Sequence, residues 1–260
     1  MRTDGRPNDQ LRPVRITRGF TQTAAGSVLW QQGMTIVWCT ASISTELPPW
    51  MKENRAGGWV TAEYVMLPAS TPARKPWPKI GHTDSRGTEI QRLIGRCLRA
   101  IVDLSKIGPH TIALDCQVLQ ADGGTRTAAI CGAYIALVDA IRKLPRELTP
   151  PGDLLRPGGP LPARWDPAFY DPAHAVLDQL AAVSVGVVDG EVRLDLDYAD
   201  DCRAGVDMNI ACTASGKLVE VQGSAENGSG FDRDMLDRML DLATGGCKRL
   251  MELQTDALRT

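Results

Sequence analysis

No long apolar run occurs in this sequence of 260 residues, although 43% of its residues are hydrophobic, as in an ordinary globular protein. A helix that crosses a bilayer needs roughly 20 consecutive apolar residues. The first residues, MRTDGRPNDQLRPVRITR, also lack the apolar stretch of a signal peptide. The sequence therefore predicts no membrane segment and a cytoplasmic location. Its length suits one large α/β domain or two closely fused small ones.

Several catalytic signatures are missing too. The sequence contains no C-x-x-C pair, no P-loop, no H-E-x-x-H and no Rossmann glycine fingerprint. The seven cysteines are scattered, mostly within apolar stretches, which favours reduced, buried thiols over disulfides or zinc. His82, His110 and His174 lie beside or near glycine or proline, so we expect them at the surface rather than in a Ser-His-Asp triad.

The chain has no excess of positive charge. Its net charge is −2 at pH 7, so any contact with nucleic acid must be a local patch. Of the 29 basic residues, 22 are arginine. The planar arginine fork suits phosphate recognition, although a GC-rich coding sequence produces the same bias.

The first half of the chain predicts a hairpin, a helix, a strand and a second helix. Residues 27–32 and 35–44 are rich in β-branched and aromatic residues and flank a glycine, which is typical of a hairpin. Apolar residues recur with helical spacing over 87–104 and about 127–143, and they alternate over 111–118 as in a strand. The arginine-rich residues 1–20 form either a basic arm or a strand with one charged face.

The second half repeats this order of elements. Residues 145–172 hold eight of the 17 prolines and predict a long surface loop or an insertion, closed by a short helix at about 173–181. Residues 182–188 and 191–198 flank an Asp-Gly pair, the strongest hairpin signal in the chain. Two strands, 206–213 and 217–222, and an amphipathic helix over 231–256 follow. This order hints at an internal duplication.

The segment GGTRT at 123–127 is the first candidate for chemistry. Its glycines let backbone N–H groups approach an anion, and the start of the next helix adds unpaired donors and positive potential. Thr125 supplies a hydroxyl and Arg126 a bidentate charged fork. The segment predicts a phosphate cradle; the alternative is a tight turn before an ordinary helix. Arg86 is either a second phosphate ligand or a solvated charge.

An acidic run is the second candidate, and it comprises Asp195, Asp197, Asp200, Asp201 and Asp207. We expect the first two on one face of a strand, the next two at its end, and Asp207 early in the following strand. Antiparallel neighbours joined by a short loop bring Asp201 and Asp207 together. Two carboxylates plus water suit Mg²⁺ or Mn²⁺. The alternative is a solvated acidic loop, which Asp207 disfavours because strands normally avoid aspartate.

Eight stretches, in order along nearly the whole chain, carry a family resemblance. They are RPNDQLRPV at 6–14, GSVLW at 26–30, CTASI at 39–43, GWVTAEYVMLP at 58–68, RGTEIQRLIGRCLRA at 86–100, LDCQVLQADGGTRTAAICGA at 114–133, AAVSVGVVDGEVRLDLDYADD at 181–201 and VDMNIACTASGKLVEVQGSAE at 206–226. LQADGGTRTA combined with DLDYxxD is highly specific. The chain resembles the ribonuclease PH family of phosphorolytic exoribonucleases, which are related to polynucleotide phosphorylase and the exosome ring subunits.

The resemblance implies an α/β (α+β) fold of duplicated β-β-α-β-α units, like domain 2 of ribosomal protein S5, with mixed sheets packed against helices. Residues 1–260 would form a single domain with an insertion at about 145–172. It also implies a phosphorolytic nucleotidyltransferase that removes the 3′-terminal nucleotides of RNA, usually tRNA precursors, reversibly as nucleoside diphosphates. Inorganic phosphate is the co-substrate, Mg²⁺ or Mn²⁺ the cofactor, and a hexameric ring, a trimer of dimers, the expected assembly.

Residue by residue, the resemblance assigns three groups. The phosphate-binding positions are Arg86, Gly124, Thr125 and Arg126. The acidic pair that holds the metal or supports acid–base chemistry is Asp201 and Asp207, which with Arg86 and Arg126 form the expected catalytic set. The positions expected beside RNA are Arg92, Arg96, Arg99, Arg74, Lys75 and Lys79. The sequence departs from the family in the loop 69–83, where Ala69 and Pro72 replace more polar or basic residues, and in the longer insertion.

The mechanism implied is attack by the cradled phosphate on the last phosphodiester, in line with the departing 3′ oxygen. Such a reaction needs positioning and charge neutralisation more than a nucleophilic side chain. Two alternatives differ in class. A non-catalytic RNA-binding ring subunit would be marked by loss of the phosphate arginines or the acidic pair, and both are present. A small-molecule kinase would need a Gly-rich ATP loop, which we do not find.

Overall fold

The computed structural model describes residues 2, 4–46, 48–51, 57–77, 84–150, 162–225 and 230–259. Two sheets and four helices make up its layers. The first sheet has the order β1 (Val14–Arg18), β2 (Gly26–Gln32), β3 (Thr35–Ser44), β5 (Thr111–Gln120) and β4 (Trp59–Met66). The second has the order β7 (Glu191–Leu194), β6 (Leu180–Val188), β8 (Val206–Thr213) and β9 (Leu218–Ala225). Neighbouring strands of the two sheets pair antiparallel, except β4 and β5, which are parallel.

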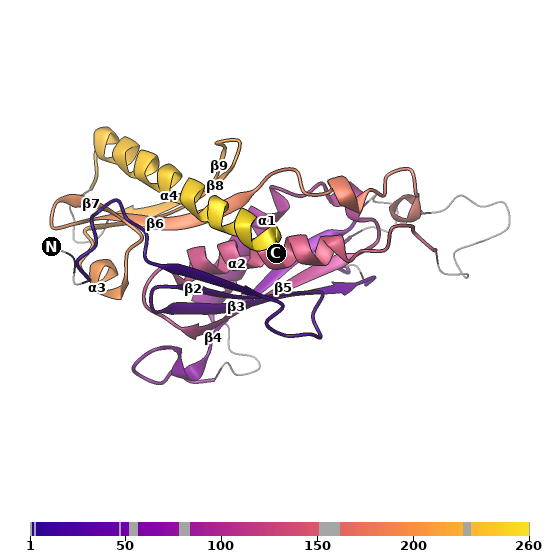
Figure 1. The fold of residues 1–260 in the computed structure, drawn as a ribbon, viewed down its shortest axis with the longest axis horizontal. Helices are drawn as coiled ribbons and strands as arrows, with labels where there is room; N and C mark the ends of the chain where they lie inside the picture. The colour runs from indigo at the N-terminus through magenta and orange to yellow at the C-terminus, as the bar shows by residue number, and fades with distance from the viewer. Residues whose placement is uncertain are drawn as a thin grey trace.

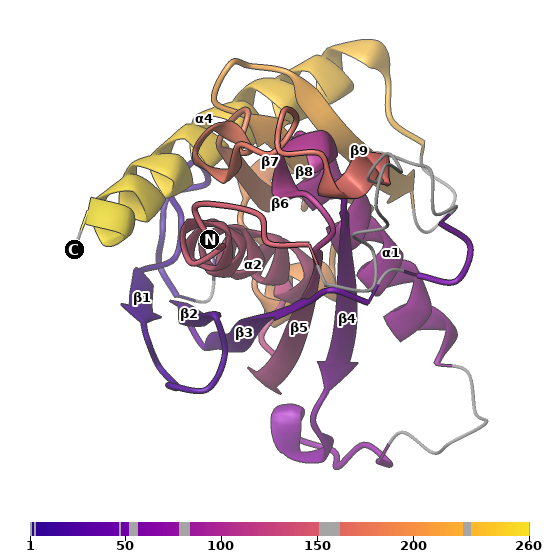
Figure 2. The same ribbon diagram turned by 90° about the vertical axis from the view of Figure 1, so that its right-hand side faces the viewer.

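Helix α2 (Thr125–Arg142) lies between the two sheets and is buried on nearly every side. Its Cys131 thiol donates to the Ala182 carbonyl of β6 at 3.3 Å, and its Ala129 carbonyl accepts from the Cys39 thiol of β3 at 3.7 Å. Figure 2 views α2 almost end-on, with β1 to β5 beneath it and the second sheet and α4 (Arg233–Arg259) above. A helix that is apolar all round, rather than on one stripe, is what this central position requires.

Helix α1 (Ser85–Arg99) packs against β4 beside α2, and the single-turn helix α3 (Tyr198–Asp201) follows β7. Figure 1 shows α3 near the start of α2 and α4 crossing the second sheet. Each half of the chain thus has a hairpin, an inner helix, at least one further strand and a closing helix. One apolar core includes residues of both halves. The expected α/β fold with sheets packed on helices is confirmed, although only the first sheet is mixed and the second is antiparallel throughout.

The elements differ from the expected ranges at identifiable points. Helix α1 spans Ser85–Arg99 and not 87–104, and a short 3₁₀ turn at Leu104–Ile107 follows. The helix expected at 173–181 is wrong, because only the 3₁₀ turn Pro172–His174 forms there before β6 begins at Leu180. Other 3₁₀ turns lie at Pro68–Ser70 and Ala163–Trp165. The insertion contains residues 151–161, which lie outside the described residues.

Two expectations about surface residues also fail. His110 is buried, and its Nδ1 lies 2.7 Å from the Ile107 carbonyl oxygen, so it closes a turn rather than facing solvent. His174 is exposed, and His82 lies outside the described residues. Of the two alternatives for residues 1–20, the basic arm is wrong, because Arg2 and Arg12 are buried, whereas a strand does form over Val14–Arg18. Among the described parts of the chain, no helix has the length and apolar character to span a bilayer.

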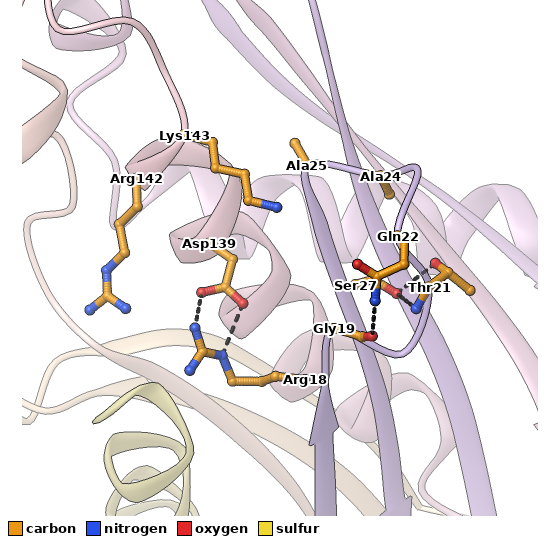
Figure 3. Close-up of a pocket in the computed structure, with 10 residues that line it drawn as sticks. All are labelled: Arg18, Gly19, Thr21, Gln22, Ala24, Ala25, Ser27, Asp139, Arg142 and Lys143. Atoms are coloured by element: carbon orange, nitrogen blue, oxygen red, sulfur yellow. Dashed lines mark hydrogen bonds and ion pairs between the residues drawn. The ribbon is translucent and has the colours of Figure 1, made fainter. Parts of the chain in front are cut away.

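A cavity of about 290 Å³ lies at the C-terminal end of α2 and is shown in Figure 3. Arg18 of β1 donates two hydrogen bonds, of 2.6 and 3.0 Å, to the Asp139 carboxylate of α2. The same arginine donates to the Ala257 carbonyl at 2.8 Å, and Arg142 donates to the Leu258 carbonyl at 3.3 Å. These cations therefore tie the last turn of α4 to α2 and β1. At 1.5 Å per residue, α2 separates this cavity from GGTRT by about 25 Å.

Candidate active site

The N-termini of α1 and α2 meet at one tyrosine. Because β4 and β5 are parallel, both helices begin beyond the carboxyl edge of the same strand pair. Tyr64 of β4 is 7% exposed, and its hydroxyl lies 2.8 Å from the Thr125 hydroxyl in the first turn of α2. A Cβ built on Gly87, in the first turn of α1, would lie 3.4 Å from the Tyr64 carbonyl oxygen. Tyr64 thus contacts the start of both helices.

Arg86 and Arg126 act on this same tyrosine. Burial raises the pKa of Tyr64, while the Thr125 hydrogen bond and the positive charges of Arg86 and Arg126 lower it in part. Both guanidinium groups are therefore within electrostatic reach of one buried hydroxyl. Two arginines that lie forty positions apart in the sequence thus both act electrostatically on one residue, Tyr64. Arg86 is exposed, whereas the Arg126 side chain is 15% exposed.

The two glycines of GGTRT have the left-handed conformation, with φ +71° at Gly123 and +64° at Gly124. A Cβ on Gly123 would lie 2.6 Å from the Leu196 carbonyl oxygen, so the DLDY segment packs directly on this turn. Gly124 precedes α2, whose N-terminus has no side-chain cap. The first backbone bond of the helix joins the Ala128 N–H to the Gly124 carbonyl at 3.0 Å. The earlier N–H groups therefore give this turn donors and positive potential for an anion.

The second sheet supplies a polar face toward this helix start. Asn209 of β8 is paired in register with Ser184 of β6 and Gln222 of β9. Asn209 also lines a narrow crevice together with Arg126 and Thr127. Asp207 lies two residues before Asn209 on the same face, a step of about 7 Å along the strand. Asp207 is half-buried on β8, where it is paired in register with Gly186 and Ser224.

Three of the five clustered aspartates hold the fold together instead. Asp195 is 1% exposed and accepts from Arg12 through the backbone N–H and two guanidinium nitrogens, at 2.7 to 3.1 Å. Asp200 is buried between Arg2 at 2.9 Å and Arg193 at 2.7 Å. The predicted strand position of the first two aspartates is wrong: β7 ends at Leu194, and Asp195 turns to φ +54°.

The third, Asp197, accepts from the Asp200 N–H at 2.8 Å and caps α3. The acidic run is thus mainly a set of internal pairs and a cap, and Asp201 and Asp207 remain as candidates. Asp201 is exposed at the end of α3, not at the end of a strand. Among the described residues, no group of three or more histidines, cysteines, aspartates or glutamates is placed to hold a metal. A hard cation here would have two carboxylates at most and would need oxygens from water or substrate.

Arg126 belongs to a hydrogen-bonded chain that the sequence did not reveal. Its Nη1 donates to the Gln222 Oε1 at 2.7 Å, and the Gln222 Nε2 donates to the Glu89 Oε1 at 2.6 Å. Nη1 lies 3.6 Å from that same Glu89 oxygen. The chain joins α2, β9 and α1. The sequence gave no signal for Gln222, which is one polar residue of an alternating strand. It gave none for Tyr64 either, which lies within an apolar strand.

Comparison with known proteins matches both halves of this architecture. A family model described as "3' exoribonuclease family, domain 1" matches residues 10–143, and one described as "3' exoribonuclease family, domain 2" matches residues 178–246. The chain belongs to the 3′ exoribonuclease family. This confirms the resemblance expected from the sequence.

Relatives within the family are similar over almost the whole chain. Ribonuclease PH of Nocardia farcinica is 51% identical over 258 residues, which cover 99% of this chain and 92% of that protein. Ribonuclease PH of Rhodococcus erythropolis is 52% identical over the same length, covering 99% and 90%. An Archaeoglobus fulgidus exosome with RNA bound to the active site has a TM-score of 0.72 at 23% identity, covering 96% of this chain and 91% of that one. The last likeness supports the fold alone.

The three α1 arginines that we expect beside RNA differ in their contacts. Arg92 is exposed and lines a surface cavity of about 420 Å³ with Arg96 and Gln222. Arg96 also pairs with Glu220 at 3.1 Å. Arg99 turns to the other side of α1, where it donates to the Val60 carbonyl at 2.9 Å and lies 4.5 Å from the centre of a tryptophan ring. The first two therefore face the candidate site, whereas Arg99 is anchored against β4.

The loop after β4 is described only in part. Arg74 is exposed, and the Lys75 Nζ lies 3.5 Å from the Met66 sulfur. Lys79 lies outside the described residues. The family assignment of this loop to RNA binding stays a prediction.

Proposed function

We propose that this exoribonuclease binds inorganic phosphate between Arg86 and the N-terminus of α2 and uses it to remove nucleotides from RNA 3′ ends. The activity class, a phosphorolytic 3′-to-5′ exoribonuclease, is supported by relatives of about 50% identity over nearly the full chain that are named ribonuclease PH. The observation that supports the phosphate site is the contact of the buried Tyr64 hydroxyl with Thr125 at the start of α2, where the charges of Arg86 and Arg126 both lower the pKa of Tyr64.

The reaction follows from this placement. A phosphate oxygen attacks the phosphorus of the last phosphodiester, the bond to the 3′ oxygen of the preceding nucleotide breaks, and a nucleoside diphosphate leaves. The backbone donors at the start of α2 and the two arginines neutralise charge on the attacking phosphate. The shortened RNA keeps the leaving oxygen as its 3′ hydroxyl after a proton arrives. Because one phosphoanhydride replaces one phosphodiester, the reverse addition of nucleotides also proceeds.

Asp201 and Asp207 are the residues we propose for Mg²⁺ or Mn²⁺. Their oxygens are hard ligands, and Mg²⁺ is commonly held by one or two carboxylates plus substrate phosphates and water. When bound, such an ion stabilises charge on the transferring phosphoryl group. Asp207, half-buried two residues before Asn209 on β8, is also the residue that we propose to hold a proton for the leaving oxygen. Removal of divalent ions should abolish activity, and Asp207→Asn should not recover it at any Mg²⁺ concentration.

The experiment for the proposed activity uses RNA with a free 3′ end, with and without phosphate. We expect nucleoside diphosphates only when phosphate is present. Arg126→Ala should lose roughly a hundredfold or more in rate, because one well-placed donor to a transferring group has that effect. Arg164→Ala, at a position distant from the site in sequence and fold, serves as the matched arginine control. Equal release without phosphate, or release of monophosphates, contradicts the proposal.

The finer properties of the family extend this proposal. We propose tRNA precursors as substrates, a homohexameric ring built as a trimer of dimers, a single domain over residues 1–260 and a cytoplasmic location. The shared core of both halves supports the single domain. Light scattering tests the ring, with six times the mass of one chain expected. A non-catalytic ring subunit is disfavoured because both arginines and both aspartates are present.

A further inference from the structure

The Arg126 guanidinium is held by one of its edges only. Nη1 donates to Gln222 and lies near Glu89, whereas Nη2 and Nε have no hydrogen-bond partner among the residues that the structure describes. A guanidinium presents five N–H donors in a fixed fork. Fixing Nη1 therefore fixes the plane of the group and leaves the Nε–Nη2 edge as a bidentate donor for an anion.

This chain of contacts needs a side chain in the middle that both accepts and donates hydrogen bonds. Arg126 can only donate hydrogen bonds and an ionised Glu89 can only accept them, so the side chain between them must accept at one end and donate at the other. Gln222 does both, with its oxygen at 2.7 Å and its nitrogen at 2.6 Å. The same requirement fixes which end of the amide is oxygen. Gln222 is in turn held on β9 by its pairing with Asn209.

Glu89 lies at the mouth of the site. Its side chain is 49% exposed, it is three residues after Arg86 on α1, and it lines the cavity of about 420 Å³ with Gln222 and Arg92. A carboxylate at this position would repel a free phosphate. Its hydrogen bond to Gln222 is therefore more readily explained by orientation of Arg126 than by direct contact with the anion.

We propose that Gln222 and Glu89 are positioning residues that hold Arg126 for phosphate, Gln222 by fixing Nη1 and Glu89 by fixing Gln222. The inference rests on the proposed function, because it takes phosphate as the ligand of Arg126. In this proposal, the arginine that binds the attacking phosphate is oriented by a contact between α1 and β9. Both elements lie far from the GGTRT turn in the sequence. Neither residue forms or breaks a bond in the reaction.

The first test is Gln222→Leu, which keeps the side-chain size and removes both hydrogen bonds. We expect the KM for phosphate to rise about tenfold, with kcat within threefold of wild type and the KM for RNA unchanged within twofold. Val221→Ala, the neighbouring exposed position on β9, is the matched control and should leave all three unchanged. A purely structural role would lower the melting temperature without raising the KM for phosphate selectively.

Exchange of the two groups is the second test. Gln222→Glu alone places two carboxylates where a 2.6 Å hydrogen bond now lies, and we expect the KM for phosphate to rise at least tenfold. The double variant Gln222→Glu/Glu89→Gln restores one carboxylate and one amide in reversed order. It should recover most of that loss. A double variant no better than Gln222→Glu, or Gln222→Leu with a phosphate KM within twofold of wild type, overturns the inference.

A binding measurement separates this inference from the proposed function. Inorganic phosphate should raise the melting temperature of the wild-type protein, and the rise should be lost in Gln222→Leu but kept in Val221→Ala. If the wild type releases no nucleotide in a phosphate-dependent way, the proposed function fails, and the phosphate-dependent melting still decides the role of Gln222. If the melting response of Gln222→Leu equals that of wild type, the positioning role fails while the proposed function stands.

Discussion

The hydroxyl of Tyr64 lies 2.8 Å from the hydroxyl of Thr125, so a buried strand residue orients a side chain in the first turn of α2. Tyr64 also packs through its backbone against the first turn of α1. This contact brings the starts of two helices, forty positions apart in sequence, to the carboxyl edge of β4 and β5, where we propose the anion site.

Tyr64→Phe should weaken phosphate binding without preventing folding. Loss of one hydrogen bond costs about 1 kcal/mol, which corresponds to roughly a fivefold rise in the KM for phosphate. The aromatic ring and its packing remain. Steady-state kinetics at saturating RNA measure the effect. Thr125→Val removes the other partner and should have an effect at least as large, whereas an unchanged phosphate KM in both variants would remove this pair from the site.

The two glycines of GGTRT should differ in their tolerance of a methyl group. Both have left-handed φ values, which cost an alanine about 1–2 kcal/mol. A Cβ at Gly123 also meets the backbone at Leu196, whereas a Cβ at Gly124 meets the end of the Arg12 side chain at 2.9 Å. We expect Gly123→Ala to reduce the free energy of unfolding more than Gly124→Ala. Urea denaturation measures both, and the reverse order contradicts this packing.

Substitution of two α1 arginines should have different effects, because we expect Arg92 to bind RNA and Arg99 to stabilise the fold. Arg92→Ala should weaken the binding of single-stranded RNA and reduce the slope of log K against log salt by about 0.7, the value for one phosphate contact. Arg99→Ala should chiefly lower the melting temperature, because Arg99 contacts Val60 and a tryptophan ring of β4. Filter binding at several salt concentrations, with thermal unfolding of each variant, measures both effects. Equal salt slopes for Arg92→Ala and wild type would exclude Arg92 from RNA contact.

Lowering the pH should destabilise the protein, in part because Asp195 becomes protonated. Burial opposes ionisation of Asp195, but the charge and hydrogen bonds of Arg12 outweigh it and lower the pKa of Asp195 below its ordinary value of 3.8. Because the folded pKa is the lower one, the unfolded state binds the proton more readily at low pH. The stabilisation is therefore complete above about pH 5 and is lost as the pH falls through the folded pKa.

The matched variant for this effect is Asp195→Asn. It leaves Arg12 buried without its partner and should cost about 3–5 kcal/mol at neutral pH. Its free energy of unfolding should then fall less steeply between about pH 5 and pH 2 than that of wild type. Urea unfolding at several pH values compares the two slopes. Parallel curves would mean that the pair does not contribute to the pH dependence.

Local patterns in the sequence were sufficient for most of the fold. The hairpins around Gly33 and Gly190 and the strand over 111–118 formed as expected, because alternation and turn residues act over a few positions. The turn and helix start at GGTRT were predictable for the same reason, since two adjacent glycines favour left-handed conformations just before a helix. The helix expected after the insertion failed because Val176 instead forms an isolated bridge with Val102, far away in the sequence.

Contacts between distant segments could not be predicted. Arg12 and Asp195 are 183 positions apart, and neither the basic N-terminus nor the acidic run indicated that they neutralise each other in the core. The same holds for Gln222, 96 positions from Arg126. An isolated charge or amide gives no sign of its partner, because a buried ion pair is recognisable only once burial is known.

Isotopic labelling of the released nucleotide tests the central claim most directly. The protein would be incubated with RNA bearing a free 3′ hydroxyl and with phosphate labelled with ¹⁸O, and the products analysed by mass spectrometry. We predict nucleoside diphosphates whose terminal phosphoryl group carries the label, since the phosphate itself forms the new bond to the nucleotide. Unlabelled monophosphates, with the label left entirely in free phosphate, would show that water is the attacking group and would contradict the account.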